Sequence, residues 1–215
     1  MKKSLIYFTI LILTLLSTSI AVKTFNISEE KLKEFTKKYG DNAQTRVLLW
    51  DNMMESAKQK DTLNQLKDVN DFFNKIKYEI DLSHWGKNDY WAAPFEFLGT
   101  GAGDCEDYAI AKYYSLRKLG IPEERLRITY VKLLQRGTKY EQAHMVLTYY
   151  HKPGATPVVL DNVNKKLKLA TKRTDLKPVY SFNAQGLWQA KNKGKTSKLV
   201  GANNLSSWKD LMTRI

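Results

Sequence analysis

The sequence contains one cysteine, Cys105, within residues 101–109, which read GAGDCEDYA. Three carboxylates lie beside this thiol, on Asp104, Glu106 and Asp107. A thiolate is a strong nucleophile, and a histidine that removes the thiol proton would make this stretch a centre for covalent catalysis. A buried, inert thiol is the alternative interpretation, because free cysteines are among the most buried residues.

The residues around the cysteine predict a helix that begins at Asp104 or Cys105. Asp104 is a favourable N-cap, and Asp107 follows three residues later, as in a capping box. Apolar residues continue at helical spacing until Gly120 and Pro122 end the helix. Cys105 would then lie in the first turn, where backbone N–H groups and the helix dipole favour a thiolate.

A catalytic base has to come from one of three histidines, His84, His144 or His151. His144 lies in residues 143–150, where apolar and polar residues alternate in part as expected for a strand. A turn sequence containing Pro153-Gly154 follows and leads into a second short apolar run, residues 157–161. The two runs therefore predict a β-hairpin that carries His144 on its first strand.

The type of turn decides which residues of the hairpin face each other. A two-residue loop pairs residues whose numbers sum to 305, which places Asp161 directly across from His144. A type II turn centred on Pro153 and Gly154 gives a sum of 307 and places Asp161 opposite Val146. We favour the second register, because proline fits the tighter loop poorly. In both registers Asp161 shares a face with His144 and can orient its imidazole.

The carboxylates beside Cys105 need an explanation, because their charge opposes formation of a thiolate. A bound cation would offset that charge, and clustered carboxylates next to a glycine-rich loop are typical ligands of Ca²⁺. The spacing is not that of an EF-hand, and the sequence has no His/Cys cluster of the kind that binds zinc. Helix capping together with solvated acids remains the alternative interpretation.

The composition and the N-terminus indicate an exported globular protein. Apolar residues make up 43% of the 215 residues, which is enough for a core, and the net charge is +13. A positive charge of this size would suit a protein that binds nucleic acid. Residues 1–21, however, combine a basic start, an apolar run and small residues before Ala21, as in a signal peptide that is cleaved after that residue. An uncleaved membrane anchor is the alternative. Both place the folded part outside the cytoplasm, so we expect no nucleic-acid partner.

We expect residues 22–215 to form one α+β domain. Helices come first, at residues 28–39, 43–54 and 63–80, and residues 81–103 read as an irregular wall or lid beside the cysteine. After the cysteine-bearing helix, residues 126–134, 143–150, 157–161, 178–182 and 187–189 are predicted strands. A lysine-rich tail at residues 191–198 precedes a last short helix that carries Trp208, Leu211 and Met212 on one side.

Several blocks of the sequence resemble a known family. They are residues 89–98 (DYWAAPFEFL), 103–113 (GDCEDYAIAKY), 143–147 (AHMVL), 160–162 (LDN) and 173–183 (RTDLKPVYSFN). Together they are similar to the LapG family, the bacterial transglutaminase-like cysteine proteinases. The resemblance extends from about Tyr39 to Trp188.

The resemblance implies a papain-like, transglutaminase-core fold and a periplasmic, calcium-dependent endopeptidase. Members of the family cut a large repeat adhesin near its N-terminus, at a di-alanine type of site, and so release cells from a biofilm. The resemblance gives the role of nucleophile to Cys105, that of base to His144 and that of orienting acid to Asp161. The predicted helix and hairpin indicate the same three residues.

The resemblance also implies ligands and a partner. The implied calcium ligands are Asp104 and Glu106, with Asp107 as a further candidate. The implied partner is the periplasmic domain of an inner-membrane receptor for cyclic di-GMP, which sequesters the protease and brings it to the membrane surface. A surface tryptophan serves this docking in the family, and Trp85 and Trp91 are the candidates.

Two other functions remain open from the sequence. A transglutaminase or acyltransferase would use the same triad and pass the thioester to an amine instead of water. An exported binding module with a structural Cys105 would have no catalytic activity.

Overall fold

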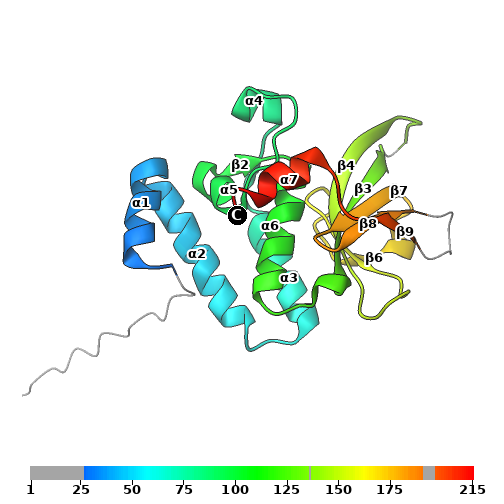
Figure 1. Ribbon diagram of the computed structural model, residues 1–215, viewed down its shortest axis with the longest axis horizontal. Coiled ribbons are helices and arrows are strands. Elements are labelled where there is room, and N and C mark those ends of the chain that lie inside the picture. The colour runs from blue at the N-terminus through cyan, green and yellow to red at the C-terminus, as the bar shows by residue number, and fades with distance from the viewer. Residues whose placement is uncertain (1–26, 136, 191–196) are drawn as a thin grey trace, which may run out of the picture.

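The protein is described here by a computed structural model of residues 27–135, 137–190 and 197–215. Figure 1 shows helices on one side and an antiparallel sheet on the other, with α6 (Cys105–Lys118) packed between α3 (Thr62–Phe73) and the sheet. The expected α+β order, helices first and strands later, is confirmed. The remaining described helices are α1 (Glu29–Tyr39), α2 (Asp41–Ala57), α4 (Asp81–Trp85), α5 (Pro94–Thr100) and α7 (Ser206–Met212).

The main sheet has the strand order β6-β5-β4-β3-β7-β8-β9, and all neighbouring strands run antiparallel. At its centre β3 pairs with β4 along the full length of both strands. The very short edge strands, β6 and β9, were not predicted from the sequence. The strands are β3 (Leu126–Leu134), β4 (Glu141–Tyr149), β5 (Val158–Leu160), β6 (Lys168–Leu169), β7 (Leu176–Asn183), β8 (Gly186–Gln189) and β9 (Lys198–Gly201).

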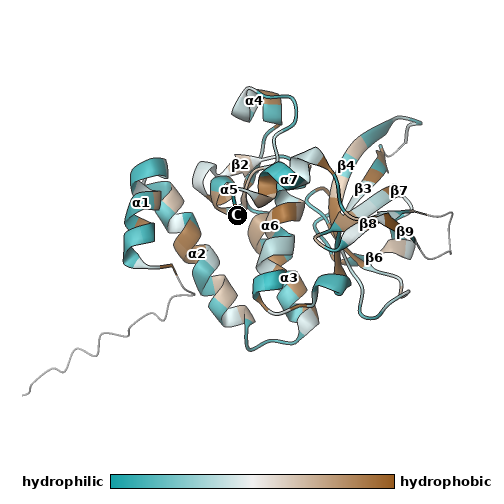
Figure 2. Cartoon of the chain, viewed as in Figure 1, coloured by the Kyte–Doolittle hydropathy of each residue, from teal (hydrophilic) through white to brown (hydrophobic). Residues whose placement is uncertain are grey.

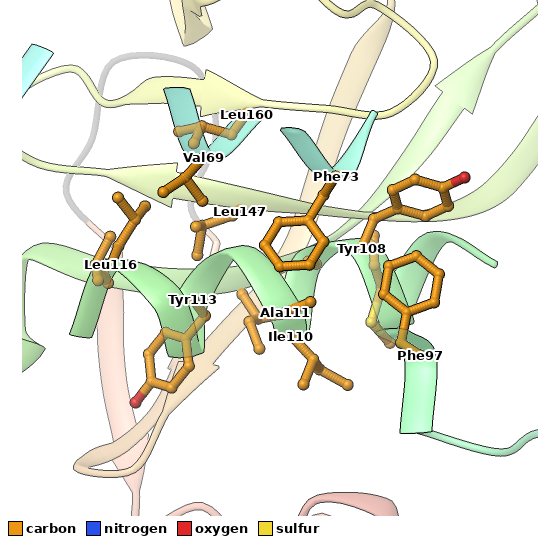
Figure 3. Close-up of a cluster of buried hydrophobic side chains, with 14 of the residues drawn as sticks. Val69, Phe73, Phe97, Tyr108, Ile110, Ala111, Tyr113, Leu116, Leu147 and Leu160 are labelled. Atoms are coloured by element: carbon orange, nitrogen blue, oxygen red, sulfur yellow. The ribbon is translucent and has the colours of Figure 1, made fainter. Parts of the chain in front are cut away.

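The helix α6 lies at the centre of the core and is buried over most of its length. Figure 3 shows Phe73 of α3, Phe97 of α5 and Leu147 of β4 around it. All three side chains are fully buried, and each such burial contributes roughly 1.5–3 kcal/mol. This packing fixes the N-terminus of α6, and with it Cys105, against one end of the sheet.

The two faces of β4 belong to different apolar clusters. Met145 and Leu147 pack toward α6 in the main core, whereas Val146 packs with Val131 and Val159 in a second, smaller cluster. Because side chains alternate along a strand, His144 lies on the face of the second cluster. The sequence predicted this separation of His144 from the face of Met145 and Leu147.

The predicted register of the hairpin is confirmed. Leu147 pairs with Leu160, so the numbers of paired residues sum to 307. The turn is closed by the Ala155 N–H, which donates to the carbonyl oxygen of Lys152 over 3.2 Å. Gly154 has a φ of +76°, the left-handed conformation that a type II turn requires at its third residue.

The predicted third helix is too long. α3 ends at Phe73, and the chain then turns so that β1 (Lys77–Tyr78) pairs in parallel with β2 (Ala102–Gly103). The apolar residue Ile80, counted in the helical stripe, is 53% exposed. Pairing with β2, 25 residues further along the chain, outweighs the helical periodicity because it gives this backbone hydrogen-bond partners.

The segment 81–103 is more regular than expected. It contains the short helices α4 and α5, joined by a connection that carries Trp91. Pro94 opens α5 at its first position, and the Glu96 carboxylate accepts a hydrogen bond from the Ala93 N–H over 2.8 Å. Both features are typical of the first turn of a helix, so the start of α5 could have been predicted from the sequence.

Figure 2 shows α1 as largely hydrophilic, in line with the absence of fully buried residues from that helix. None of the helices in the described ranges is both long and apolar enough to cross a bilayer. The proposed signal peptide, residues 1–21, lies outside the described residues, as does most of the lysine-rich tail. The last helix is confirmed as α7, which buries Trp208 and Leu211.

Candidate active site

Cys105 is the first residue of α6, as predicted. The Asp107 carboxylate accepts a hydrogen bond from the Asp104 N–H over 3.2 Å, which forms one half of the predicted capping box. The chain enters the helix through β2, so β1 lies beside the residues that precede the thiol. Three independent restraints, the cap, the β1–β2 pair and the core packing of α6, therefore position Cys105.

The thiol has an unfavourable electrostatic environment for ionisation. Burial, followed by the charges of Glu106 and Asp104, raises the pKa of Cys105 well above its usual value. The thiol donates a hydrogen bond to Glu106 Oε2 over 3.1 Å, which also favours the protonated form. The Met145 N–H acts in the opposite direction and lowers the pKa. The helix α6 that begins with Cys105 packs on β4, the strand that carries His144.

His144 and Asp161 form the contact that the hairpin predicted. His144 Nε2 lies 2.9 Å from Asp161 Oδ1, and both side chains are buried. This bond occupies Nε2 and leaves Nδ1 as the ring nitrogen for proton transfer. Within the described ranges, no hydrogen bond joins Cys105 to His144. Of the other histidines, His84 lies 3.8 Å from Glu79, and His151 is exposed.

Asp161 remains ionised although its carboxylate is almost fully buried. Burial by itself would raise its pKa, but the hydrogen bonds from His144 and the Val163 N–H, together with the Arg173 guanidinium, hold that pKa well below its usual value. The Val163 N–H donates to Oδ1 over 2.9 Å, and Arg173 Nη2 lies 2.7 Å from Oδ2. Sequence reasoning assigned no role to Arg173, because no local pattern links it to Asp161.

A second group of residues holds the backbone of Asp161. Asn74, which caps the end of α3, donates from Nδ2 to the carbonyl oxygen of Asp161 over 2.9 Å. Its Oδ1 accepts a hydrogen bond from the buried amine of Lys112 over 2.8 Å. The central helix is thus connected through Asn74 to the strand end that carries Asp161.

The acids near Cys105 form a wider cluster than the sequence indicated. Asp104 and Glu106 lie together with the thiol, Asp104 and Asp107 lie near Asp81, and Glu106 lies near Asp81 and Asp89. The candidate ligand atoms within each of these groups are all within 4.8 Å of one another. Asp81 and Asp89 come from the segment before α5, so only the folded chain brings them to Asp104 and Glu106.

The arrangement of this cluster fits a cation. Asp81 Oδ1 and Asp104 Oδ1 are buried oxygens without a hydrogen-bond partner among the described residues. Burial, followed by Glu106, raises the pKa of Asp104 to about 8, and burial raises the pKa of Asp81 to about 6. Both oxygens of Asp107, by contrast, accept backbone N–H groups, from Ala92 and from Asp104. Hard oxygen donors of this kind suit Ca²⁺.

The two candidate docking tryptophans differ in exposure. Trp91 is only 5% exposed and stacks on Phe182 at 5.4 Å, so it is not a surface residue. Trp85 is half-buried, and its Nε1 has no hydrogen-bond partner among the described residues. Of the two, Trp85 alone offers a partly exposed ring.

A cavity lies away from these residues. It has a volume of about 570 Å³ and lies among α1, α2, α5, α6 and the C-terminus, with Phe35, Trp50 and Tyr114 in its walls. None of Cys105, His144 and Asp161 lines it. The chemistry of the triad, and not this cavity, identifies the candidate active site.

The model of the bacterial transglutaminase-like cysteine proteinase (BTLCP) family matches residues 31–192. The chain belongs to this family. Calcium-bound LapG of Legionella pneumophila is 43% identical, with a TM-score of 0.72, and the match covers 87% of this chain and 99% of that one. EGTA-treated LapG of the same organism is 42% identical, with a TM-score of 0.74 and coverages of 87% and 97%. No curated protein matches the chain.

Membership of the BTLCP family makes this protein a cysteine peptidase with a transglutaminase-like fold. The resemblance and the fold class inferred from the sequence are therefore confirmed. The alternative of a non-enzymatic binding module is not supported.

Proposed function

We propose that this protein is a periplasmic, calcium-dependent cysteine endopeptidase that uses Cys105, His144 and Asp161. The observation that carries the proposal is the 2.9 Å contact between His144 Nε2 and Asp161 Oδ1. His144 lies on β4, and the helix that packs on this strand, α6, begins with the only cysteine of the sequence. A nucleophile, a base and a group that orients the base are the parts that acyl transfer requires.

The proposed reaction follows from these positions. His144 Nδ1 takes the thiol proton while Asp161 accepts the hydrogen bond from Nε2–H and stabilises the imidazolium. The sulfur of Cys105 attacks the peptide carbonyl, and the amine leaves with the proton from His144. Water, deprotonated by His144, then hydrolyses the thioester. The Cys105 N–H and a donor from the segment near Trp85 stabilise the oxyanion.

Calcium enters this proposal through the carboxylates. Asp104, Glu106 and Asp107 are the ligands proposed from the sequence, and Asp81 and Asp89 lie close enough to these acids to be further candidate ligands. Bound Ca²⁺ would offset the negative charge that raises the pKa of the Cys105 thiol. The calcium-bound state of the similar Legionella LapG supports this assignment.

The calcium proposal is tested by titrating Ca²⁺ into the EGTA-treated protein. We expect Asp104→Asn and Asp81→Asn to weaken binding by at least about tenfold, since each removes a charged oxygen ligand. Asp41→Asn, an exposed acid at the start of α2, is the matched control and should bind normally. Normal affinity in both ligand variants would place the ion elsewhere.

The proposed substrate is a large repeat adhesin, cut near its N-terminus at a di-alanine type of site. The proposed partner is the periplasmic domain of a cyclic di-GMP receptor in the inner membrane, which would sequester the protease and thus control the release of biofilm cells. Both rest on membership of the BTLCP family, and export rests on the signal-like sequence of residues 1–21.

The experiment for the reaction measures product masses from an adhesin fragment that contains the di-alanine site. Cleavage should require Cys105, so Cys105→Ala should yield no products while its circular dichroism remains that of the wild type. EGTA should stop cleavage, and Ca²⁺ but not Mg²⁺ should restore it. Cross-linked products in place of two fragments would indicate a transglutaminase, and cleavage by Cys105→Ala would overturn the assignment.

A further inference from the structure

We infer that Arg173 is a positioning residue of the active site, which fixes Asp161 so that Oδ1 faces His144 Nε2. This inference rests on the proposed triad. Nothing in the sequence pattern or in the family resemblance assigns a role to Arg173, although it opens the block 173–183. The two oxygens of the Asp161 carboxylate contact different partners.

Oδ1 of Asp161 already serves two partners. His144 Nε2 and the Val163 N–H each lie 2.9 Å from it. Oδ2 has no hydrogen-bond partner among the described residues and instead forms an ion pair with Arg173, whose Nη2 lies 2.7 Å from it. The carboxylate is therefore fixed from both sides, and rotation about its terminal bond would break the contacts of Arg173 and His144 together.

Arg173 is itself held in place. Its Nε lies 2.9 and 3.2 Å from the two oxygens of Asp175, and its Nη2 lies 2.7 Å from Asp175 Oδ2. The carbonyl oxygen of Asp175 accepts a hydrogen bond from the Leu134 N–H over 2.8 Å, which ties this turn to the end of β3. A planar guanidinium with a bidentate partner loses little freedom when it also contacts Asp161.

Arg173 and Asp161 form a buried ion pair. Arg173 is 2% exposed and Asp161 is 1% exposed, and the segment around Arg173 covers the face of the sheet that carries His144. The group Asp161–Arg173–Asp175 keeps one net negative charge, which can stabilise an imidazolium at His144. Without Arg173, burial would disfavour the ionised form of Asp161, and the carboxyl group would then stabilise an imidazolium at His144 less well.

The test uses the alkylation rate of Cys105 by uncharged iodoacetamide, because no other cysteine is present and no substrate is needed. We expect Arg173→Gln to slow alkylation near pH 7 by at least about tenfold and to shift the pH–rate profile, as loss of a supporting partner does in comparable sites. Arg173→Lys should recover only part of the rate, since lysine lacks the bidentate geometry. Guanidinium ion should raise the rate of Arg173→Ala.

Arg117→Gln is the matched control, because Arg117 also pairs with a carboxylate, Glu123 at 2.7 Å, but is not in contact with the triad. It should alkylate at the wild-type rate. If Arg173→Gln does not fold, Asp175→Asn replaces it in the test. This variant should shift the pH–rate profile of Cys105 alkylation in the same direction, but by a smaller amount. A lower melting temperature with an unchanged pH–rate profile would make Arg173 a purely structural residue and overturn the inference.

One further variant separates this inference from the proposed function. If His144→Ala alkylates with the wild-type pH profile, the histidine is not coupled to the thiol and the proposed triad is wrong. If His144→Ala changes the profile and Arg173→Gln does not, the triad holds and only the role of Arg173 is wrong.

Discussion

The buried amine of Lys112 gives a quantitative prediction for the stability of this protein. Lys112 is 1% exposed at the centre of α6, and its Nζ donates to Asn74 Oδ1 over 2.8 Å. None of the ion pairs among the described residues includes it. Burial lowers its pKa from 10.5 to about 7, although the nearby Asp161 and Asp71 carboxylates act to raise it.

The direction of the pH dependence follows from this lowered pKa. Between pH 7 and 10.5 the unfolded chain binds a proton at Lys112 that the folded protein has largely released. The free energy of unfolding therefore rises with pH in this range and levels off on both sides. At 1.36 kcal/mol per pH unit, the drop from 10.5 to about 7 is equivalent to about 5 kcal/mol.

The assay is urea unfolding of the wild type and of Lys112→Met at pH 7.5, 8.5 and 9.5 with Ca²⁺ in constant excess. The methionine of the variant carries no charge, so the stability of the wild type relative to the variant should rise by about 2.5 kcal/mol from pH 7.5 to 9.5. The Asn74 oxygen loses its donor in the variant, which adds a cost of about 1–3 kcal/mol that does not depend on pH.

Lys118→Met is the matched control, because Lys118 lies on the same helix but is exposed. Its stability relative to the wild type should stay constant over this pH range. If the difference for Lys112→Met is also constant, the buried amine is charged in the folded protein and the reasoning from burial fails.

Three further predictions concern packing and geometry around the site. Phe73→Ala should lower the free energy of unfolding by about 3–5 kcal/mol, because Phe73 is fully buried, whereas Leu63→Ala on the same helix, 61% exposed, should cost less than about 0.5 kcal/mol in urea titrations. Gly103→Ala should destabilise the protein by about 1–3 kcal/mol and slow alkylation of Cys105, since a Cβ there would lie 2.2 Å from Asp107 Oδ2; wild-type alkylation would show that the cap can move freely. Arg214→Ala should make the segment between α4 and α5 more susceptible to limited proteolysis, because Arg214 bonds the carbonyl of Trp91 over 2.7 Å and the hydroxyl of Tyr90 over 3.0 Å; an unchanged cleavage rate would contradict this anchoring role.

Local signals in the sequence were sufficient to predict where the residues of the proposed triad lie. The cap at Asp104 and the helical spacing after it located Cys105 at a helix N-terminus, and α6 begins at that residue. The Pro153-Gly154 turn fixed the register of the hairpin, which then placed Asp161 on the face of His144. These features are encoded within a few residues along the chain, so they can be read without knowledge of the tertiary structure.

The tertiary structure alone decided which distant residues support these groups. Asp81 and Asp89 reach the acids around Cys105 because α4 and the connection that follows it lie against the start of α6. Arg173 reaches Asp161 because the turn before β7 covers the face of β4 that carries His144. Long-range contact also explains why β1 lies where the end of the third helix was predicted, since this segment pairs with β2, a strand distant in the sequence. The stretch around Cys105 thus predicted its own local structure, whereas its charge environment depends on side chains that only long-range packing brings together.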